Sequence, residues 1–305
     1  MNNVRRTLGI DRLHSMGVTG KGINIAVIDT GIFSNHRDLK NTIIGFKDTM
    51  FFKEKPYDDN GHGTHVSGII AGSGAVSGGV YKGIAPDSGL VVIKALNNNG
   101  KGKSGSVLEA IEWILKNKSK YGINIVNISV GTLSGENTKK EETENIKLLN
   151  GVEQLWNQGM VVVVAAGNNG PENGTVTIPG ICKKVITVGV SDDYKGIGTR
   201  SNEKIVNYSG RGPANCIMKP EIVAPGSGII SCSNRINSYA SKSGTSMATP
   251  VVTGSIALFM SKNPGITNKE VKMALRDSAV DLHYSKHHQG WGMINPPGLL
   301  GIKKR

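Results

Sequence analysis

Hydrophobic residues in this chain gather in short continuous runs separated by polar, glycine-rich segments. A run of this kind occupies residues 23–29, and further short strand-like stretches lie at residues 90–96, 123–131, the start of 160–174, 185–190 and 220–226. Apolar runs without alternating polar positions are typical of parallel strands that are covered on both faces. We therefore predict a buried strand at each of these positions.

Helical periodicity lies between and after these runs. In residues 58–72 a polar loop leads into a helix with Val66, Ile69 and Ile70 on one stripe. Residues 106–120 form an amphipathic pattern, and 247–260 an apolar one. Residues 267–270, TNKE, form a capping box that predicts a helix running through Ala279.

The length of 305 residues is sufficient for one large α/β domain or two small ones. No apolar run is long enough to span a membrane, and residues 1–13 lack the hydrophobic core of a signal peptide. Cys182, Cys216 and Cys232 have no metal-like spacing, and we expect all three to be reduced and buried. A cytoplasmic location is expected, and the mature form of a secreted protein is the alternative.

The formal net charge is +13, and aromatic residues make up only 5% of the chain. Because no block of Lys and Arg is interleaved with aromatics, the composition argues against a nucleic-acid groove. The charge indicates either a solvated basic surface or a preference for acidic peptides. No nucleic-acid or membrane partner is expected, and the sequence gives no indication of the oligomeric state.

Ser246 lies where the loop SKSGTS enters the helical segment 247–260. We expect it at or beside the first helical position, with Pro250 in the first turn. A helix N-terminus favours nearby negative charge, so this placement can display a nucleophile if a base and an oxyanion donor converge on it. The alternative is an ordinary helix cap.

Asp29 ends the buried run 23–29, where an unpaired carboxylate would be costly. It either pairs with another group or caps a helix. No second D-T-G or D-S-G is present, which excludes the two-aspartate protease arrangement. His62 and His65 are three residues apart, but the H-E-x-x-H pattern of zinc enzymes is absent and no third ligand is evident.

Four strings together resemble those of the subtilisin-like serine proteases, the subtilases. They are D-T-G at 29–31, H-G-T-H-V-x-G at 62–68, A-A-G-N at 165–168 and G-T-S-M-A-x-P at 244–250. Their order along the chain is of the subtilisin type. The resemblance extends from Leu8 to Ala279 and is greatest to bacterial intracellular enzymes.

This resemblance implies a fold and a catalytic set. The fold would be a single doubly wound α/β domain over residues 1–305, with a mostly parallel central sheet flanked by helices. Asp29, His62 and Ser246 would form the triad, and Asn168 would stabilise the oxyanion. His65 would be structural. We also expect a polar surface insertion at about 132–146 and a basic tail at 301–305.

The resemblance also implies how an extended polypeptide substrate binds. The peptide would lie as an added strand between two edge segments. One wall of the pocket for the residue before the scissile bond would come from the strand end at 165–167, and Thr177 would make that pocket shallow. No acidic residue marks its floor, which predicts an apolar or medium-sized P1 residue. The residues concerned are Gly100, Lys101, Gly102, Ser129, Val130, Gly131, Ala165, Ala166, Gly167 and Thr177.

No cofactor is required for such chemistry, but the resemblance implies a possible structural calcium. Asp38 matches the aspartate ligand of the family, whereas the usual asparagine ligand is not evident in residues 73–88. We predict a serine endopeptidase of broad specificity. The alternatives are a processing protease with narrow specificity for an acidic leader or pro-peptide, and a non-catalytic subtilase scaffold.

Overall fold

Parallel β-strands form the centre of the computed structural model, which describes residues 1–131, 139–192, 207–214 and 216–302. Six strands confirm the predicted runs, and β2 was not predicted. The main strands are β1 (Asn24–Asp29), β2 (Ile43–Asp48), β3 (Gly89–Lys94), β4 (Ile123–Ile128), β5 (Val161–Ala165), β6 (Ile186–Val190) and β7 (Ile222–Ala224).

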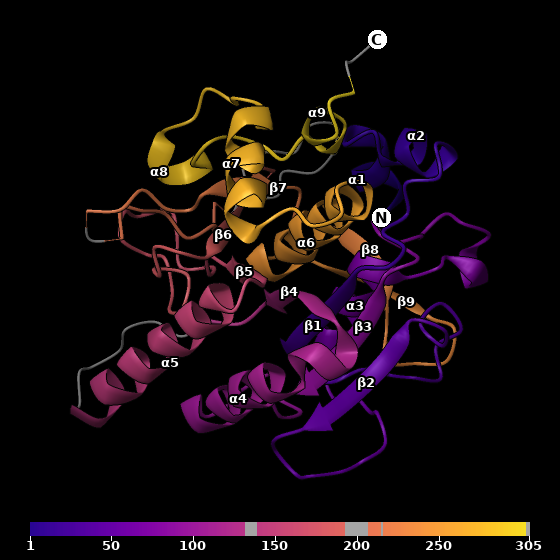
Figure 1. Cartoon of the computed structure of the whole chain (residues 1–305), viewed down its shortest axis with the longest axis horizontal. Coiled ribbons are helices and arrows are strands. Elements are labelled where there is room, and N and C mark those ends of the chain that lie inside the picture. Colours follow the sequence, from indigo (N-terminus) through magenta and orange to yellow (C-terminus); the bar gives the residue numbers. More distant parts are fainter. Residues whose placement is uncertain (132–138, 193–206, 215, 303–305) are drawn as a thin grey trace.

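These strands pair in the order β2-β3-β1-β4-β5-β6-β7, and every adjacent pair is parallel (Figure 1). β1 is buried along almost its whole length, as its continuous apolar run predicts. β2 is an edge strand, and most of its residues are only half-buried. Its mixed sequence therefore lacks the signal by which the other strands were recognised.

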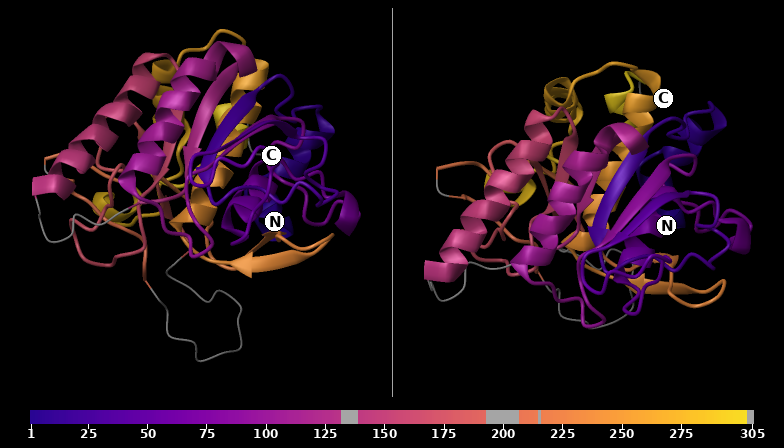
Figure 2. Two further views of the ribbon diagram at one scale, coloured as in Figure 1. Left: turned by 90° about the horizontal axis from the view of Figure 1, so that it is seen from below. Right: turned by 60° about the horizontal axis from the view of Figure 1, so that its bottom comes forward.

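Helices cover both faces of the sheet (Figure 2). α3 (His62–Ala71) and α6 (Thr245–Lys262) pack together on one face, and α4 (Ser104–Tyr121) and α5 (Lys139–Asn157) on the other. The sheet and its two helical layers confirm the predicted α/β class. The remaining helices are α1 (Asn2–Thr7), α2 (Ile10–Ser15), η1 (Ala75–Ser77), α7 (Asn268–Ser278), α8 (Lys286–Gln289) and α9 (Pro296–Leu299).

Two of the helix predictions and the expected insertion differ in how they compare with the structure. The capping box of α7 is present, with both reciprocal bonds between Thr267 and Glu270. α6 begins at Thr245, so Ser246 lies beside the first helical position as predicted, whereas Pro250 is the sixth residue and does not lie in the first turn. Residues 139–146 of the expected insertion are the polar first turns of α5, while 132–138 lie outside the described residues.

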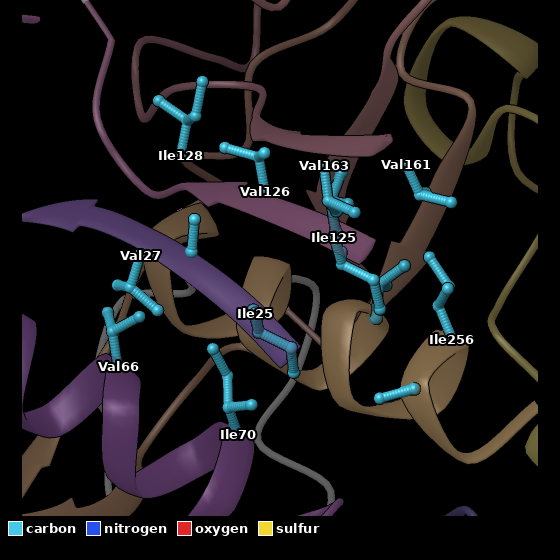
Figure 3. Close-up of a cluster of buried hydrophobic side chains, with 14 of the residues drawn as sticks. Ile25, Val27, Val66, Ile70, Ile125, Val126, Ile128, Val161, Val163 and Ile256 are labelled. Atoms are coloured by element: carbon cyan, nitrogen blue, oxygen red, sulfur yellow. The ribbon is translucent and has the colours of Figure 1, made fainter. Parts of the chain in front are cut away.

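The hydrophobic core lies between the sheet and its helices. Ile25 and Val27 of β1 meet Val66 and Ile70 of α3, and Ile256 of α6 packs nearby (Figure 3). Burying each such side chain contributes about 1.5–3 kcal/mol. One continuous cluster extends through the described core from the first helices to α9. No helix in the described ranges has the length and apolarity to cross a bilayer.

The parallel arrangement brings several strand ends to one edge of the sheet. β1 lies between β3 and β4, where the strand order reverses direction. In open α/β sheets, ligand sites form outside the carboxyl ends of the strands at such a reversal. Asp29 ends β1, Ser129 follows β4, and Ala165 ends β5. A two-stranded antiparallel ribbon of β8 (Ile229–Cys232) and β9 (Tyr239–Lys242) packs beside α3.

Candidate active site

Asp29 and His62 form a hydrogen-bonded pair at this edge of the sheet. The Asp29 side chain is fully buried at the end of β1, and His62 is the first residue of α3. His62 Nδ1 lies 2.7 Å from Asp29 Oδ1. The same oxygen accepts the Thr30 N–H at 2.7 Å. Because an ionised carboxylate only accepts hydrogen bonds, Nδ1 is the protonated nitrogen and Nε2 of neutral His62 is a base.

The surroundings of His62 favour its protonation. Burial alone would lower the pKa of His62, but the charge and hydrogen bond of Asp29 outweigh burial and raise that pKa above its ordinary value. The positive charge of Lys242 acts weakly in the opposite direction. His62 is therefore prepared to accept a proton and to hold it beside Asp29.

Asp58 fixes the loop that carries His62. Its buried carboxylate accepts hydrogen bonds from Thr30 Oγ1 at 2.9 Å, Gly61 N–H at 2.8 Å and both the N–H and hydroxyl of Thr64. Although burial would raise the pKa of Asp58, these bonds outweigh it and lower that pKa. The carboxylate thus joins the end of β1 to the first turn of α3.

Lys94 also stabilises the region between the end of β1 and the loop that carries His62. Its side chain is fully buried, and its Nζ donates to Thr30 O at 2.7 Å, Leu96 O at 3.0 Å and Asp59 Oδ1 at 2.6 Å. It also lies 4.8 Å from the ring centroid of Tyr57. Sequence reasoning missed this residue because a lysine in an apolar strand gives no indication of its partners.

Ser246 is the second residue of α6, at the helix end that favours negative charge. Its hydroxyl donates to the backbone carbonyl of Ser129 at 2.8 Å. Ser246 and His62 line the same cavity. In this structure the hydroxyl is thus bonded to the end of β4 while it faces the space shared with His62.

Asn168 follows β5 and faces Ser246 across the same cavity. Its Oδ1 accepts the Thr245 N–H at 2.9 Å and the Thr245 hydroxyl at 3.1 Å. Because these donors occupy the carbonyl oxygen, the Nδ2 group is left as a donor near Ser246. Thr245 was not predicted as a site residue, although it adjoins the serine.

The shared cavity has a volume of about 440 Å³ and opens to solvent. It lies beside an apolar cavity of about 280 Å³ that includes Lys101 and Gly102. Ala166 lines neither cavity, because it is buried and its carbonyl accepts the Thr177 N–H. The predicted residues that line the larger cavity are His62, Gly100, Ser129, Val130, Gly131, Ala165, Gly167, Asn168, Thr177 and Ser246.

Thr177 occupies the space between two glycines of this cavity. A Cβ added at Gly131 or Gly167 would overlap the Thr177 side chain. Thr177 is 3% exposed, and its hydroxyl is 3.3 Å from Ala166 O. The wall of the cavity at this point is therefore filled by a rigid β-branched side chain.

Other predicted residues lie outside the cavity. His65 donates from Nε2 to Ile229 O and Ala240 O, each at 3.0 Å, and burial lowers its pKa to about 3. Asp38 is buried beneath β9, where Tyr239 donates to it. Cys182 and Cys232 are buried as predicted, whereas Cys216 is exposed, which corrects that expectation.

Comparison with known proteins gives consistent matches. Residues 20–292 match the model of the subtilase family, peptidase family S8. The chain is 41% identical over 274 residues to the serine protease AprX of Bacillus subtilis, covering 85% of this chain but 62% of AprX. It is 34% identical to subtilisin DY of Bacillus licheniformis, covering 93% of each.

Solved structures agree with these sequence matches. Sphericase superposes with a TM-score of 0.78 at 30% identity, covering 91% of this chain and 92% of that structure. A cold-adapted subtilisin-like serine proteinase superposes with a TM-score of 0.71 at 27% identity, covering 91% and 88%.

Proposed function

This chain belongs to the subtilase family, and we propose that it is a serine endopeptidase that acts through Asp29, His62 and Ser246. The observation that carries the proposal is the 2.7 Å bond from His62 to a buried Asp29, in a cavity that Ser246 and Asn168 also line. A base, a nucleophile and an oxyanion donor at one strand edge are the components of acyl transfer.

The proposed reaction proceeds in two stages. Nε2 of His62 takes the Ser246 proton as Oγ attacks the scissile carbonyl carbon, and the protonated ring then gives that proton to the leaving amine. An acyl-enzyme on Ser246 remains. Water, deprotonated by His62, attacks the acyl carbon, and the Ser246 oxygen leaves and regains its proton. Asp29 keeps the ring in its tautomer and stabilises the imidazolium.

Charge on the former carbonyl oxygen is stabilised at the N-terminus of α6. The donors are Nδ2 of Asn168 and the backbone N–H of Ser246. Neither has to reorganise much, because Thr245 already orients the Asn168 carboxamide. These side chains and water suffice for the chemistry, so the proposal includes no cofactor.

The substrate of this proposal is an extended polypeptide that pairs with residues 100–102 and 129–131. Its residue before the scissile bond faces Thr177. Because Thr177 already fills the space beside Gly131 and Gly167, we expect small apolar residues such as alanine to be preferred over aromatic ones. The apolar cavity near Leu96 and Val107 would receive a residue further towards the amino end.

A fluorophosphonate probe tests the catalytic proposal. The folded wild-type protein should be labelled at Ser246 and should cleave casein, and Ser246→Ala should abolish both. Ser243→Ala is a matched control, because Ser243 lies in the same loop and, among the residues that the structure describes, its hydroxyl bonds only the Gly228 N–H. An unlabelled but folded wild-type protein would favour the scaffold alternative.

A narrower processing function is the second candidate, and Lys242 favours it. Lys242 ends β9, four residues before Ser246, and its positive charge acts on His62. It has no ion-pair partner among the described residues. Because it does not line the cavity around residues 129–131, we place it on the leaving-group side. An acidic substrate residue there would be attracted.

Matched peptides that differ only in Glu or Lys immediately after the scissile bond test this preference. Glu should give a kcat/KM about three to tenfold higher, and Lys242→Glu should reverse the order. Lys103→Glu, an exposed lysine that lines neither cavity, is the control. Cleavage of casein at many sites with no charge preference would support broad specificity.

The exposed, unpaired Cys216 supports a reducing compartment for the protein.

A further inference from the structure

The loop at residues 73–83 connects α3 to β3, and it is the segment for which the family resemblance implies a calcium ion. In a calcium site, six to eight oxygen atoms turn their lone pairs towards a common point. The candidate oxygens in this chain are the Asp38 carboxylate and the backbone carbonyls of the loop. Their actual partners show whether they fit such an ion.

The Asp38 carboxylate is occupied by hydrogen-bond donors. Oδ1 accepts the Val76 N–H at 2.9 Å, and Oδ2 accepts the Tyr239 hydroxyl at 2.7 Å. The Cys232 thiol lies 3.9 Å from Oδ2. Asp38 is 1% exposed. A neutral N–H and a neutral O–H therefore stabilise this carboxylate by hydrogen bonds, at the oxygens that an ion would otherwise contact.

Two carbonyls of the loop are occupied by a cation that belongs to the chain. Arg5 Nη1 donates to Lys82 O at 2.8 Å and to Val80 O at 3.2 Å. Arg5 is 8% exposed, and its Nε pairs with Asp11 at 2.7 Å. The guanidinium thus joins α1 and the start of α2 to the loop.

Other carbonyls of the loop are used within the loop itself. Gly74 O accepts the Ser77 N–H at 3.0 Å and the Gly79 N–H at 2.8 Å. Ser77 O accepts the Val80 N–H at 3.2 Å, and Gly79 O accepts the Lys82 N–H at 3.3 Å. A calcium ion would have to compete with these bonds for the carbonyls of Gly74, Ser77 and Gly79.

A transition metal fits no better, although His36, Asp38 and Cys232 lie close together. His36 Nε2 donates to Ser238 O at 3.0 Å, and its Nδ1 accepts the Asp38 N–H at 3.2 Å. Both ring nitrogens are therefore occupied. A metal would have to displace several existing bonds.

We propose that this protein replaces the structural calcium of its family with Arg5 and with the donors around Asp38. The Arg5 guanidinium supplies the cation for the loop carbonyls, and the Val76 N–H and Tyr239 hydroxyl satisfy the carboxylate oxygens by hydrogen bonds. The loop is thereby held to α1 and β9 by protein atoms alone. The folded state should neither bind calcium at this site nor depend on it.

Thermal unfolding of the Ser246→Ala protein tests the proposal without interference from self-digestion, and independently of whether the protein is a protease. The midpoint temperature should be the same in EDTA and in millimolar calcium chloride. A site bound with calcium at 100-fold its dissociation constant would raise the midpoint by several degrees. Such a rise would overturn the proposal, as would a rise with zinc chloride that Cys232→Ser abolishes.

Arg5→Met in the same background removes the cation and keeps the aliphatic stem. Its midpoint should fall by several degrees, whereas Arg6→Met, an exposed neighbour in α1, should change little. Tyr239→Phe should also lower the midpoint, because one Asp38 oxygen loses its donor. If Arg5→Met unfolds at the same temperature as Arg6→Met, the guanidinium does not hold the loop and the proposal fails.

Discussion

Thr245 holds the carboxamide of Asn168 in one orientation, because its N–H and its hydroxyl both donate to Asn168 Oδ1. The Nδ2 group is consequently the part of that side chain left to bind an oxyanion. In the proposed enzyme, catalytic power depends on this pair as well as on the triad. The relationship gives the first prediction.

Asn168→Ala should lower kcat by about 10²–10³-fold with little change in KM, a loss known from the corresponding donor in subtilisin. Thr245→Val removes one of the two orienting bonds and should lower kcat by about tenfold. Steady-state kinetics on a peptide anilide measure both effects. A rise in KM at constant kcat would instead assign Asn168 to substrate binding.

The pH dependence of kcat/KM should report the Asp29–His62 pair. Neutral His62 is the base, so activity falls as the pH drops through its pKa. Because Asp29 raises that pKa, the acid limb should lie above the ordinary histidine value of about 6.5. Asp29→Asn should lower kcat by about 10⁴-fold and move the limb to lower pH. An acid limb of the pH profile at the same pH in Asp29→Asn as in wild type would contradict the proposed role of Asp29.

Enlarging the pocket beside Thr177 should change the preferred P1 residue. Thr177→Gly removes the side chain that fills the space between Gly131 and Gly167. The ratio of kcat/KM for phenylalanine over alanine at P1 should rise at least about tenfold. Thr175→Gly, a nearby exchange outside the cavity lining, serves as the control. An unchanged ratio would place the P1 residue elsewhere.

Asp58 should stabilise the fold in a pH-dependent manner. Its pKa is lowered in the folded state, so its contribution is complete above the unfolded value of about 3.9 and is lost as the pH falls through the lower folded value. Asp58→Ala should cost about 3 kcal/mol or more at neutral pH, since several buried donors lose their acceptor. Denaturant unfolding at pH 7 and below pH 4 measures this difference.

The difference in the free energy of unfolding between wild type and Asp58→Ala should become smaller at acidic pH. Asp59→Asn is the matched control, because Asp59 is 39% exposed and keeps an oxygen for Lys94 after the exchange. A stability difference that persists unchanged at low pH would mean that packing, and not the charge, accounts for the loss.

Much of the fold could be predicted from the chain because buried parallel strands have a distinct pattern. β1, β3 and β5 are mostly apolar runs, and the parallel register then places their ends together with that of β4. β2 and α5 were missed for related reasons. One is a half-exposed edge strand and the other is polar in its first turns, so neither shows the pattern that burial imposes.

Site residues could be predicted where short sequence motifs contain them. They could not be predicted where their role depends on contacts between residues far apart in the sequence. Asp29, His62, Asn168 and Ser246 lie in strings that resemble a family. Lys94, by contrast, acts on Thr30 and Asp59, and such side-chain contacts follow only from the folded arrangement.

Arg5 shows the same limit, because its partners are backbone carbonyls more than seventy residues away. A backbone carbonyl belongs to every residue type, so no sequence pattern can point to one. The resemblance pointed to Asp38 as a calcium ligand, but the donors that surround its carboxylate could not be inferred from the sequence.

The pairing of β1 has a consequence for how the chain reaches its native state. Asn24 pairs with Gly89 on one side and with Ile123 on the other, so β1 pairs with β3 and β4 and not with β2, the strand that follows it in the sequence. Large loops must close before those contacts form, and such topologies fold slowly. During synthesis, the apolar segment at residues 24–29 cannot pair on both sides until residue 128 has emerged from the ribosome. This chain should therefore refold slowly from denaturant and aggregate when concentrated.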